Sequence, residues 1–355
     1  MRNQACISRR GFLRASVLTV ASGGILARRM TAAENLQGKV LTVLGPIAPD
    51  ELGMTLAHEH CVVDFLGAEK AKAPRHDADE AFSTILPHLK RLKERGCRTL
   101  VECTPNYIGR DVRLLKRLAT ASGLHILTNT GYYGAAGNKF LPQHAFTETA
   151  DSLAKRWLGE WREGIDGTGI RPGFIKLGVE KGKLPEVHVK LVRAAARAHL
   201  ESGLTIAIHT GDGEAALDEL RVLQEEGVAP SALIWVHAQN DPGKIQIEAA
   251  KRGAWVSLDG FGEKQRDRYK AFLGALRAGN LVTRVLLSHD HFWSVEGQGE
   301  RGTLKLHSGG AATAFESVFT HLLPDLREAG FTEAEIRQLT VKNPAEAFSI
   351  RARKI

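Results

Sequence analysis

Short apolar runs alternate with amphipathic stretches along most of the chain. Runs such as LTIAIH and ALIWVH are apolar almost throughout, which is typical of parallel strands that are buried on both faces. An earlier segment, VLTVLGPI over 40–47, predicts a small strand or hairpin ahead of them. We expect the main strands at about 54–60, 98–103, 124–130, 171–177, 204–209, 232–237, 254–259 and 284–289.

The stretches between these runs carry apolar residues at helical spacing. In KLVRAAARAHLESG, for example, Leu191, Ala194 and Ala198 share one helix face, and Gly203 is the expected stop. Asp212, in HTGDG, is expected to cap the N-terminus of the helix that follows it. The predicted helices cover about 78–95, 111–122, 148–163, 188–202, 214–227, 242–252 and 265–279, with final helices over 310–329 and 333–348.

Eight strand–helix units in succession predict an α/β fold, a (β/α)8 TIM barrel. The chain has 355 residues and is 43% hydrophobic, which is enough for one large core. We therefore assign residues 34–355 to a single barrel domain. Cys61, Cys97 and Cys103 lack the spacing of a disulfide framework and are expected to be core thiols.

The positive charge of the chain is concentrated at its N-terminus. The net charge of +8 includes six arginines and no acidic residue in the segment 1–33, and subtracting these six from 48 leaves 42 basic residues against 40 acidic ones. Nucleic-acid binding therefore loses its main support. The segment contains the twin-arginine pattern SRRGFLR, then an apolar stretch over 15–27 and the small residues Thr31-Ala32-Ala33. This order predicts a twin-arginine signal peptide over 1–33 and a periplasmic or secreted protein.

Residues with metal-binding side chains close several of the predicted strands. They span some 230 residues of sequence, yet each follows an apolar run and precedes a loop. The ends of parallel strands converge on one face of a barrel, so distant residues of this kind are expected to meet at its C-terminal face. They are His58, His60, Lys176, His209, His237 and Asp290.

The residue types at these positions suit a metal centre. His58 and His60 are two apart on one strand, so both face the same side while Glu59 points away. Histidine nitrogens and an aspartate oxygen are ordinary ligands of divalent metals. Lys176 is unusual because a charged residue inside an apolar strand needs a specific partner. It is either a salt-bridged lysine or one that carries CO2 as an anionic carbamate.

The segments around these residues resemble a known family. LAHEH, FIKLG, IAIHTGDG, WVHAQND and LLSHD are similar, in this order, to the strand-end signatures of the phosphotriesterase family in the amidohydrolase superfamily. The resemblance extends to GYYGAAG and to TVKNPAEAF near the end of the chain. It covers nearly the whole chain after the predicted signal.

The resemblance implies a binuclear site with two divalent ions, most often zinc. His58, His60 and Asp290 would hold the more buried ion, and His209 and His237 the more exposed one. Lys176, as N6-carboxylysine, would bridge the two together with a hydroxide. That hydroxide would attack the substrate, and Asp290 would take or pass on the proton.

The same resemblance favours hydrolysis of a lactone or related carboxylic ester over hydrolysis of a phosphotriester, which is the alternative. Two further readings are a non-catalytic barrel that binds a ligand and a one-metal hydrolase with unmodified Lys176. The expected partner is a small molecule. No stable membrane insertion is expected after signal removal, and a homodimer is compatible with the resemblance.

Substrate selection is expected to depend on the loops after the strands. Tyr133 is a candidate for the pocket, with ordinary packing at the barrel rim as the alternative. Asp259 and Trp293 are further candidates, the latter beside Phe292 in an apolar wall. Lactonase-like relatives often have arginine after the aspartate that matches Asp259, whereas Gly260 stands here, which puts that arginine contact in doubt.

Overall fold

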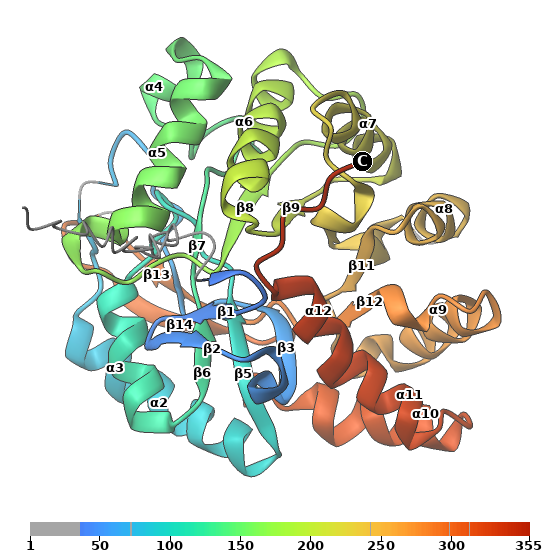
Figure 1. The fold of residues 1–355 in the computed structure, drawn as a ribbon. Coiled ribbons are helices and arrows are strands. Elements are labelled where there is room, and N and C mark those ends of the chain that lie inside the picture. The colour runs from blue at the N-terminus through green and yellow to red at the C-terminus, as the bar shows by residue number, and fades with distance from the viewer. Residues whose placement is uncertain (1–35, 72, 242, 298, 312) are drawn as a thin grey trace, which may run out of the picture.

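The computed structural model describes residues 36–71, 73–241, 243–297, 299–311 and 313–355. In this part of the chain, parallel strands form a central barrel and helices surround it (Figure 1). The (β/α)8 barrel predicted from the sequence is therefore confirmed. The predicted signal peptide lies outside the described residues, and its role in export stays a prediction.

The barrel strands occupy the positions that the apolar runs predict. One hydrogen-bonded sheet joins β3, β5 and β6, and another joins β7 to β12 in order along the chain. β6 and β7 follow one another directly and make one barrel strand that is interrupted at Thr128. The strands are β3 (Met54–Glu59), β5 (Cys97–Glu102), β6 (His125–Leu127), β7 (Asn129–Thr130), β8 (Phe174–Gly178), β9 (Ile206–His209), β10 (Leu233–Val236), β11 (Trp255–Leu258) and β12 (Val285–Leu287).

The helices begin and end near the predicted capping residues. Asp212 accepts a hydrogen bond from the backbone N–H of Ala215 and caps α7, as predicted. Gly203 ends α6 with a φ of 76°, a left-handed conformation that glycine adopts at low cost. The helices are α2 (Ala78–Glu94), α3 (Val112–Ser122), α4 (Gln143–Thr147), α5 (Ala150–Glu163), α6 (Glu186–Ser202), α7 (Gly213–Glu225), α8 (Lys244–Arg252), α9 (Arg266–Ala278), α10 (Leu323–Glu328), α11 (Glu333–Arg337) and α12 (Asn343–Phe348).

The helix predicted over 310–329 begins later than expected, with a π-turn at Val318–Leu322 that leads into α10. Two backbone N–H groups of this region, those of Phe315 and Val318, donate to the rings of His291 and His289. Phe315 also has a φ of 70°, outside the helical range. Contacts with distant residues therefore replace the helical hydrogen bonds that the local sequence favours.

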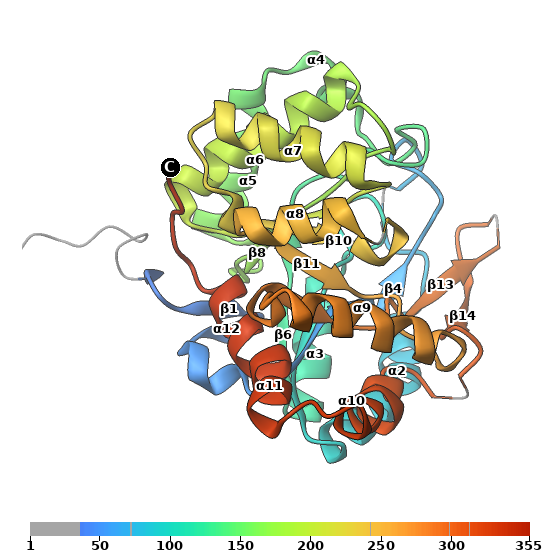
Figure 2. The same cartoon turned by 90° about the vertical axis from the view of Figure 1, so that its right-hand side faces the viewer.

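Two small sheets lie at opposite ends of the barrel (Figure 2). The predicted hairpin is present as β1 (Val40–Thr42) and β2 (Gly45–Ile47), and it lies at the same end as α12. The sequence did not predict the other sheet, which consists of β4 (Val62–Val63), β13 (Phe292–Glu296) and β14 (Thr303–His307). β4 and β13 are the next strands after β3 and β12, so this sheet lies at the end of the barrel where those strands finish.

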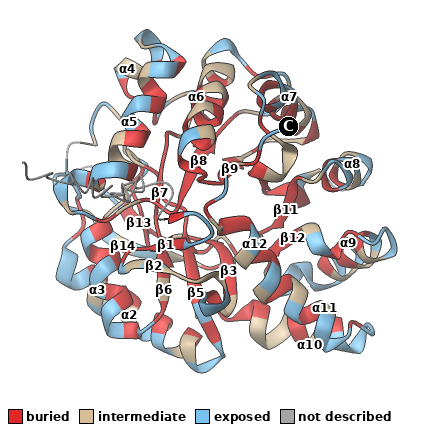
Figure 3. Cartoon of the chain, in the orientation of Figure 1, coloured by how far each residue is buried: buried red, intermediate tan, exposed pale blue. Residues whose placement is uncertain are grey.

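The core has two large parts, one inside the barrel and one between strands and helices, and a small third cluster of Val63, Ile108 and Phe140. Most residues of the barrel strands are buried, and the helices bury one face each (Figure 3). The inner part includes Phe174, Ala207 and Val101. Because side chains alternate along a strand, Lys176, His209 and Cys103 continue the same inward faces two residues later. These three side chains therefore form a layer next to the inner core, at the C-terminal end of the barrel.

The three cysteines of the described residues are free and buried, as predicted. Among the described residues, none of the helices is both long and apolar enough to span a membrane.

Candidate metal centre

The six residues singled out from the strand ends line a single cavity of about 120 Å3. His58 belongs to β3, and His60 is the first residue after that strand. Lys176 belongs to β8, and His209 is the last residue of β9. His237 follows β10, and Asp290 lies between β12 and β13. The expectation that these distant residues meet at the end of the barrel therefore agrees with the structure.

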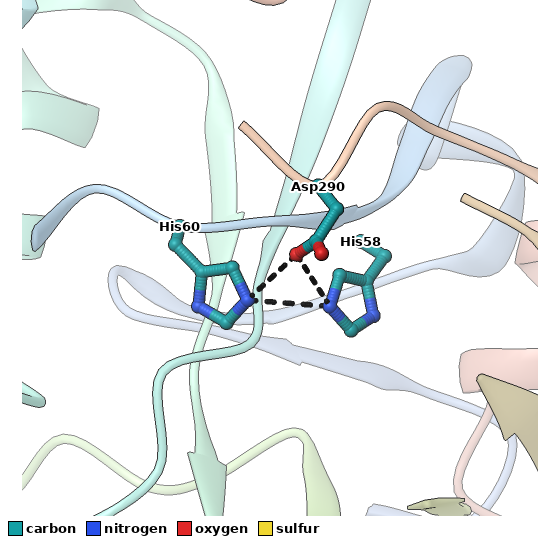
Figure 4. Close-up of side chains that lie close together, drawn as sticks. All are labelled: His58, His60 and Asp290. Atoms are coloured by element: carbon teal, nitrogen blue, oxygen red, sulfur yellow. Dashed lines mark hydrogen bonds and ion pairs between the residues drawn. The ribbon is translucent and has the colours of Figure 1, made fainter. Parts of the chain in front are cut away.

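His58, His60 and Asp290 form the tightest group (Figure 4). The Nε2 atoms of the two imidazoles lie 3.2 Å apart, and each is 3.2 Å from Oδ1 of Asp290. Burial lowers the pKa of His58 to about 4, so its ring is neutral and has a lone pair to give to a metal. Three donor atoms from three directions, all within hydrogen-bond distance, are suitable for one divalent ion.

His209 and His237 continue the group across the cavity. Their ring centroids are 4.6 Å apart, and the ring of His237 is 5.1 Å from that of His58. Nε2 of His237 lies 4.0 Å from Oδ2 of Asp290. Asp290 therefore stands between the two sets of histidines, with one oxygen toward each.

Lys176 lies among these donors with only 2% of its surface exposed. Its Nζ donates one hydrogen bond, to the backbone oxygen of Leu177 at 3.2 Å. Burial lowers the pKa of the Lys176 ammonium, so the neutral amine is favoured more than usual. The neutral amine is the form that reacts with CO2. The surroundings of Lys176 thus fit a carbamate better than a salt-bridged ammonium.

Two of the six residues have a left-handed backbone. His237 and Asp290 each have a φ of 63°, a conformation that costs free energy for residues other than glycine. Such conformations persist only where surrounding contacts hold them, and they occur often at functional sites. The loops after β10 and β12 are therefore held in a shape that serves the cavity.

Asp259 lies behind the histidines rather than among the residues that line the cavity. It is fully buried, and its two oxygens accept hydrogen bonds from Nδ1 and from the backbone N–H of His237, at 2.7 and 3.1 Å. Burial alone would raise the pKa of Asp259, but His237 and His58 bring that pKa well below its usual value. The predicted pocket residue thus serves as an anionic support for His237.

A second support lies behind His60, and the sequence reasoning missed it. Nδ1 of His60 is 2.9 Å from the hydroxyl of Thr104, which donates to the buried carboxylate of Glu102 at 2.5 Å. Outer partners of this kind fix the orientation of a metal-binding imidazole. Glu102 and Thr104, at the end of the run TLVECT, are the sequence feature from which this support could have been predicted.

The remaining predicted pocket residues divide between cavity and core. Tyr133 lines the cavity, and its ring is 5.0 Å from that of His209. Phe292 also lines the cavity, but Trp293 is buried against His88 and Phe315. Successive residues of β13 face opposite sides, so only one of the two aromatic residues can form the predicted apolar wall.

Fold and site together define an α/β barrel protein in which four histidines, an aspartate and a lysine line one cavity. The sequence pattern of the phosphotriesterase family matches residues 38–348. The chain belongs to this family, whose members are hydrolases with a binuclear metal centre.

Individual relatives agree with this assignment. The phosphotriesterase homology protein of Escherichia coli is 31% identical, over 84% of this chain and 99% of its own. An organophosphorus hydrolase from Deinococcus radiodurans has a TM-score of 0.78 at 29% identity, covering 90% of this chain and 99% of its own. A mutant of a lactonase of the same family, also from Deinococcus radiodurans, has a TM-score of 0.76 at 29% identity, covering 87% and 99%.

Proposed function

We propose that this protein is a hydrolase that uses two divalent metal ions, most suitably zinc, to cleave a lactone or a related carboxylic ester. The observation that carries the proposal is the meeting of four histidines, one aspartate and one buried lysine in a single cavity. Family membership supports the hydrolase class. The likeness to a structure described as a lactonase supports the lactone as substrate.

The donor atoms divide into two sets. His58, His60 and Asp290 would hold one ion, and His209 and His237 the other, with carboxylated Lys176 shared between them. Two ions held in this way would supply hydroxide near neutral pH and a Lewis acid for the oxygen of the substrate.

The chain itself contributes orientation and proton transfer. Asp259 keeps Nδ1 of His237 protonated, so that Nε2 is free to face the cavity. Asp290, with an oxygen toward each set of histidines, is placed to accept a proton at Oδ1 or Oδ2 and to release it when the leaving group needs one.

The walls of the cavity favour an uncharged substrate. Apart from the six donors, the cavity is lined by Cys103, Tyr133 and a mostly apolar group, Val63, Phe65, Pro105, Ile108 and Phe292. Among the described lining residues, no arginine and no lysine other than Lys176 is available to pair with an anionic substrate. A neutral ester or lactone with a small apolar substituent fits this lining.

A larger cavity of about 610 Å3 lies nearby, between the segment around Arg75 and the start of α3. Its most buried arginines already have partners, since Arg75 pairs with Asp64 and Arg110 with Glu160. We therefore assign the chemistry to the smaller cavity with the six donors.

Phosphotriester hydrolysis is the second candidate, because the same ions would serve a phosphoryl group and a similar structure is named an organophosphorus hydrolase. The test is a screen of the metal-loaded protein with lactones, carboxylic esters and phosphotriesters. We expect the highest kcat/KM with a lactone or ester. Turnover of phosphotriesters alone would reverse the order, and metal binding without any turnover would favour a non-catalytic barrel.

A further inference from the structure

The carboxylate of Glu59 lies between His58 and His60 in sequence but faces away from the metal cavity. It is fully buried and receives four hydrogen bonds from the segment around Asp290. The donors are the hydroxyl of Ser288 at 2.7 Å, the backbone N–H of His289 at 2.9 Å, Nδ1 of His289 at 2.6 Å and the backbone N–H of His291 at 2.9 Å. One carboxylate thus holds the residues on both sides of Asp290.

This contact lies at the seam where the barrel closes. In the described part of the chain, no ladder of strand hydrogen bonds joins β3 to β12. Single bonds join the two segments instead: Asp290 donates from its backbone N–H to the oxygen of His58 at 3.2 Å, and His60 donates to the oxygen of His291 at 2.9 Å. The Glu59 carboxylate adds the largest group of hydrogen bonds across this seam.

Glu59, His289 and His291 are close enough to one another to suggest an ion site. Their hydrogen bonds argue against it. Nε2 of His289 accepts from the N–H of Val318 at 2.8 Å, so Nδ1 carries the proton and donates to Glu59. Nδ1 of His291 accepts from the N–H of Phe315 at 3.0 Å. These nitrogen lone pairs are already used, and the cluster is a hydrogen-bond network.

We propose that Glu59 is a positioning residue, which holds the backbone around Asp290 so that its carboxylate faces His58 and His60. Asp290 has a φ of 63°, and a conformation of this cost needs contacts that hold it. The two hydrogen-bonded neighbours of Asp290, His289 and His291, are fixed by the same carboxylate. The inference rests on the proposed metal site, because positioning Asp290 matters only if Asp290 binds an ion.

The test compares zinc affinity between the unaltered protein and three variants, by chelator competition on the whole chain. Glu59→Gln keeps the shape but turns an amide N–H2 toward N–H donors. Ser288→Ala removes one of the four donors to Glu59, and with it the hydroxyl oxygen that accepts from the backbone N–H of His58 at 3.0 Å. Asp325→Asn is the control, because Asp325 is also a buried carboxylate but pairs with Arg266, on α9.

We expect Glu59→Gln to weaken zinc binding about 10- to 100-fold, which is typical for loss of an outer partner of a metal site. Ser288→Ala should weaken it less, and Asp325→Asn should leave it unchanged even if it lowers the Tm. The absorption spectrum of cobalt-loaded protein should change in Glu59→Gln and not in the control. If Glu59→Gln does not fold, unchanged zinc affinity in Ser288→Ala overturns the proposal.

Unchanged zinc affinity in Glu59→Gln and Ser288→Ala would overturn the proposal, and so would an equal loss in Asp325→Asn. A third ion in the unaltered protein that disappears in Glu59→Gln would show an ion site at Glu59 instead. If the unaltered protein binds no metal, the proposed metal site fails and the positioning role fails with it. If it binds metal but cleaves no ester, only the reaction class fails.

Discussion

Nδ1 of His237 donates a hydrogen bond of 2.7 Å to Oδ1 of Asp259, a carboxylate that is fully buried behind the metal cavity. The other oxygen of Asp259 accepts from the backbone N–H of His237 and lies 3.8 Å from Nδ1 of His58. One carboxylate therefore stands behind a histidine from each of the two proposed sets. This arrangement makes Asp259 a support for the centre as a whole.

Replacing Asp259 by Asn should weaken the binding of both ions. An amide of the same shape can present its N–H2 to the ring of His237 and allows the wrong tautomer. We expect zinc affinity to fall about 10- to 100-fold, with little change in the far-ultraviolet circular dichroism spectrum. Asp325→Asn, which alters a buried carboxylate that pairs with Arg266, is the matched control. Equal zinc affinities of Asp259→Asn and the unaltered protein would contradict the role given to Asp259.

Lys176 should be required for metal binding as a carbamate. Its amine is buried and favours the neutral form that reacts with CO2. We expect Lys176→Ala to lose at least one ion per chain, and metal-free protein to take up zinc more slowly in CO2-free buffer than with bicarbonate. Metal content and the rate of zinc uptake are the measurements, because a carbamate is lost in the acid used for mass spectrometry. Unchanged metal content and activity in Lys176→Ala would support the one-metal hydrolase.

Phe292 should contribute to binding of the apolar part of the substrate. It lines the cavity, and its ring is 6.4 Å from that of His60. For the best lactone or ester, Phe292→Ala should lower kcat/KM about tenfold or more, mainly through KM, with metal content unchanged. Phe146→Ala removes an exposed phenylalanine on α4 and should change neither quantity. An effect of the same size in both variants would disprove a specific role of Phe292.

Protonation of His199 should make the fold less stable in mild acid. It is fully buried on α6, with Nδ1 bonded to the oxygen of Leu204 and Nε2 to the N–H of Arg353. Burial lowers the pKa of His199 to about 4, below its ordinary value of 6.5. The unfolded chain therefore binds the proton first, and stability is lost as the pH falls from about 6.5 to about 4.

The loss from this one group is at most about 3 kcal/mol, in proportion to the shift of its pKa. Urea unfolding of metal-free protein at pH 7 and pH 5 measures it, and His199→Gln should show a smaller difference between the two pH values. A difference as large in His199→Gln as in the unaltered protein would rule out His199 as the cause.

The sequence predicts the barrel and the meeting of the six residues in one cavity well, because both follow from local patterns. Apolar runs of strand length mark β8 and β9, and Lys176 and His209 lie near or at their ends. In a barrel, that position alone brings the side chains together. The family resemblance then adds a second ion and a modified lysine, which local patterns do not contain.

Residues that act through distant contacts were harder to predict. Asp259 also closes an apolar run, and its sequence does not reveal that it faces His237 instead of the cavity. Phe292 and Trp293 could not be told apart because β13 pairs with β4, which is far away in sequence. Glu59 and Glu102 looked like ordinary strand residues, although Glu59 contacts the distant segment around Asp290 and Glu102 contacts Thr104, the partner of His60.

The measurement that tests the central claim most directly is the metal content of the protein, purified in zinc-replete buffer with bicarbonate and determined by elemental analysis. We predict close to two zinc ions per chain. Replacing His209 and His237 together should leave about one, held by His58, His60 and Asp290. A protein that holds no metal under these conditions, or whose content is unchanged by that double replacement, would contradict the binuclear centre.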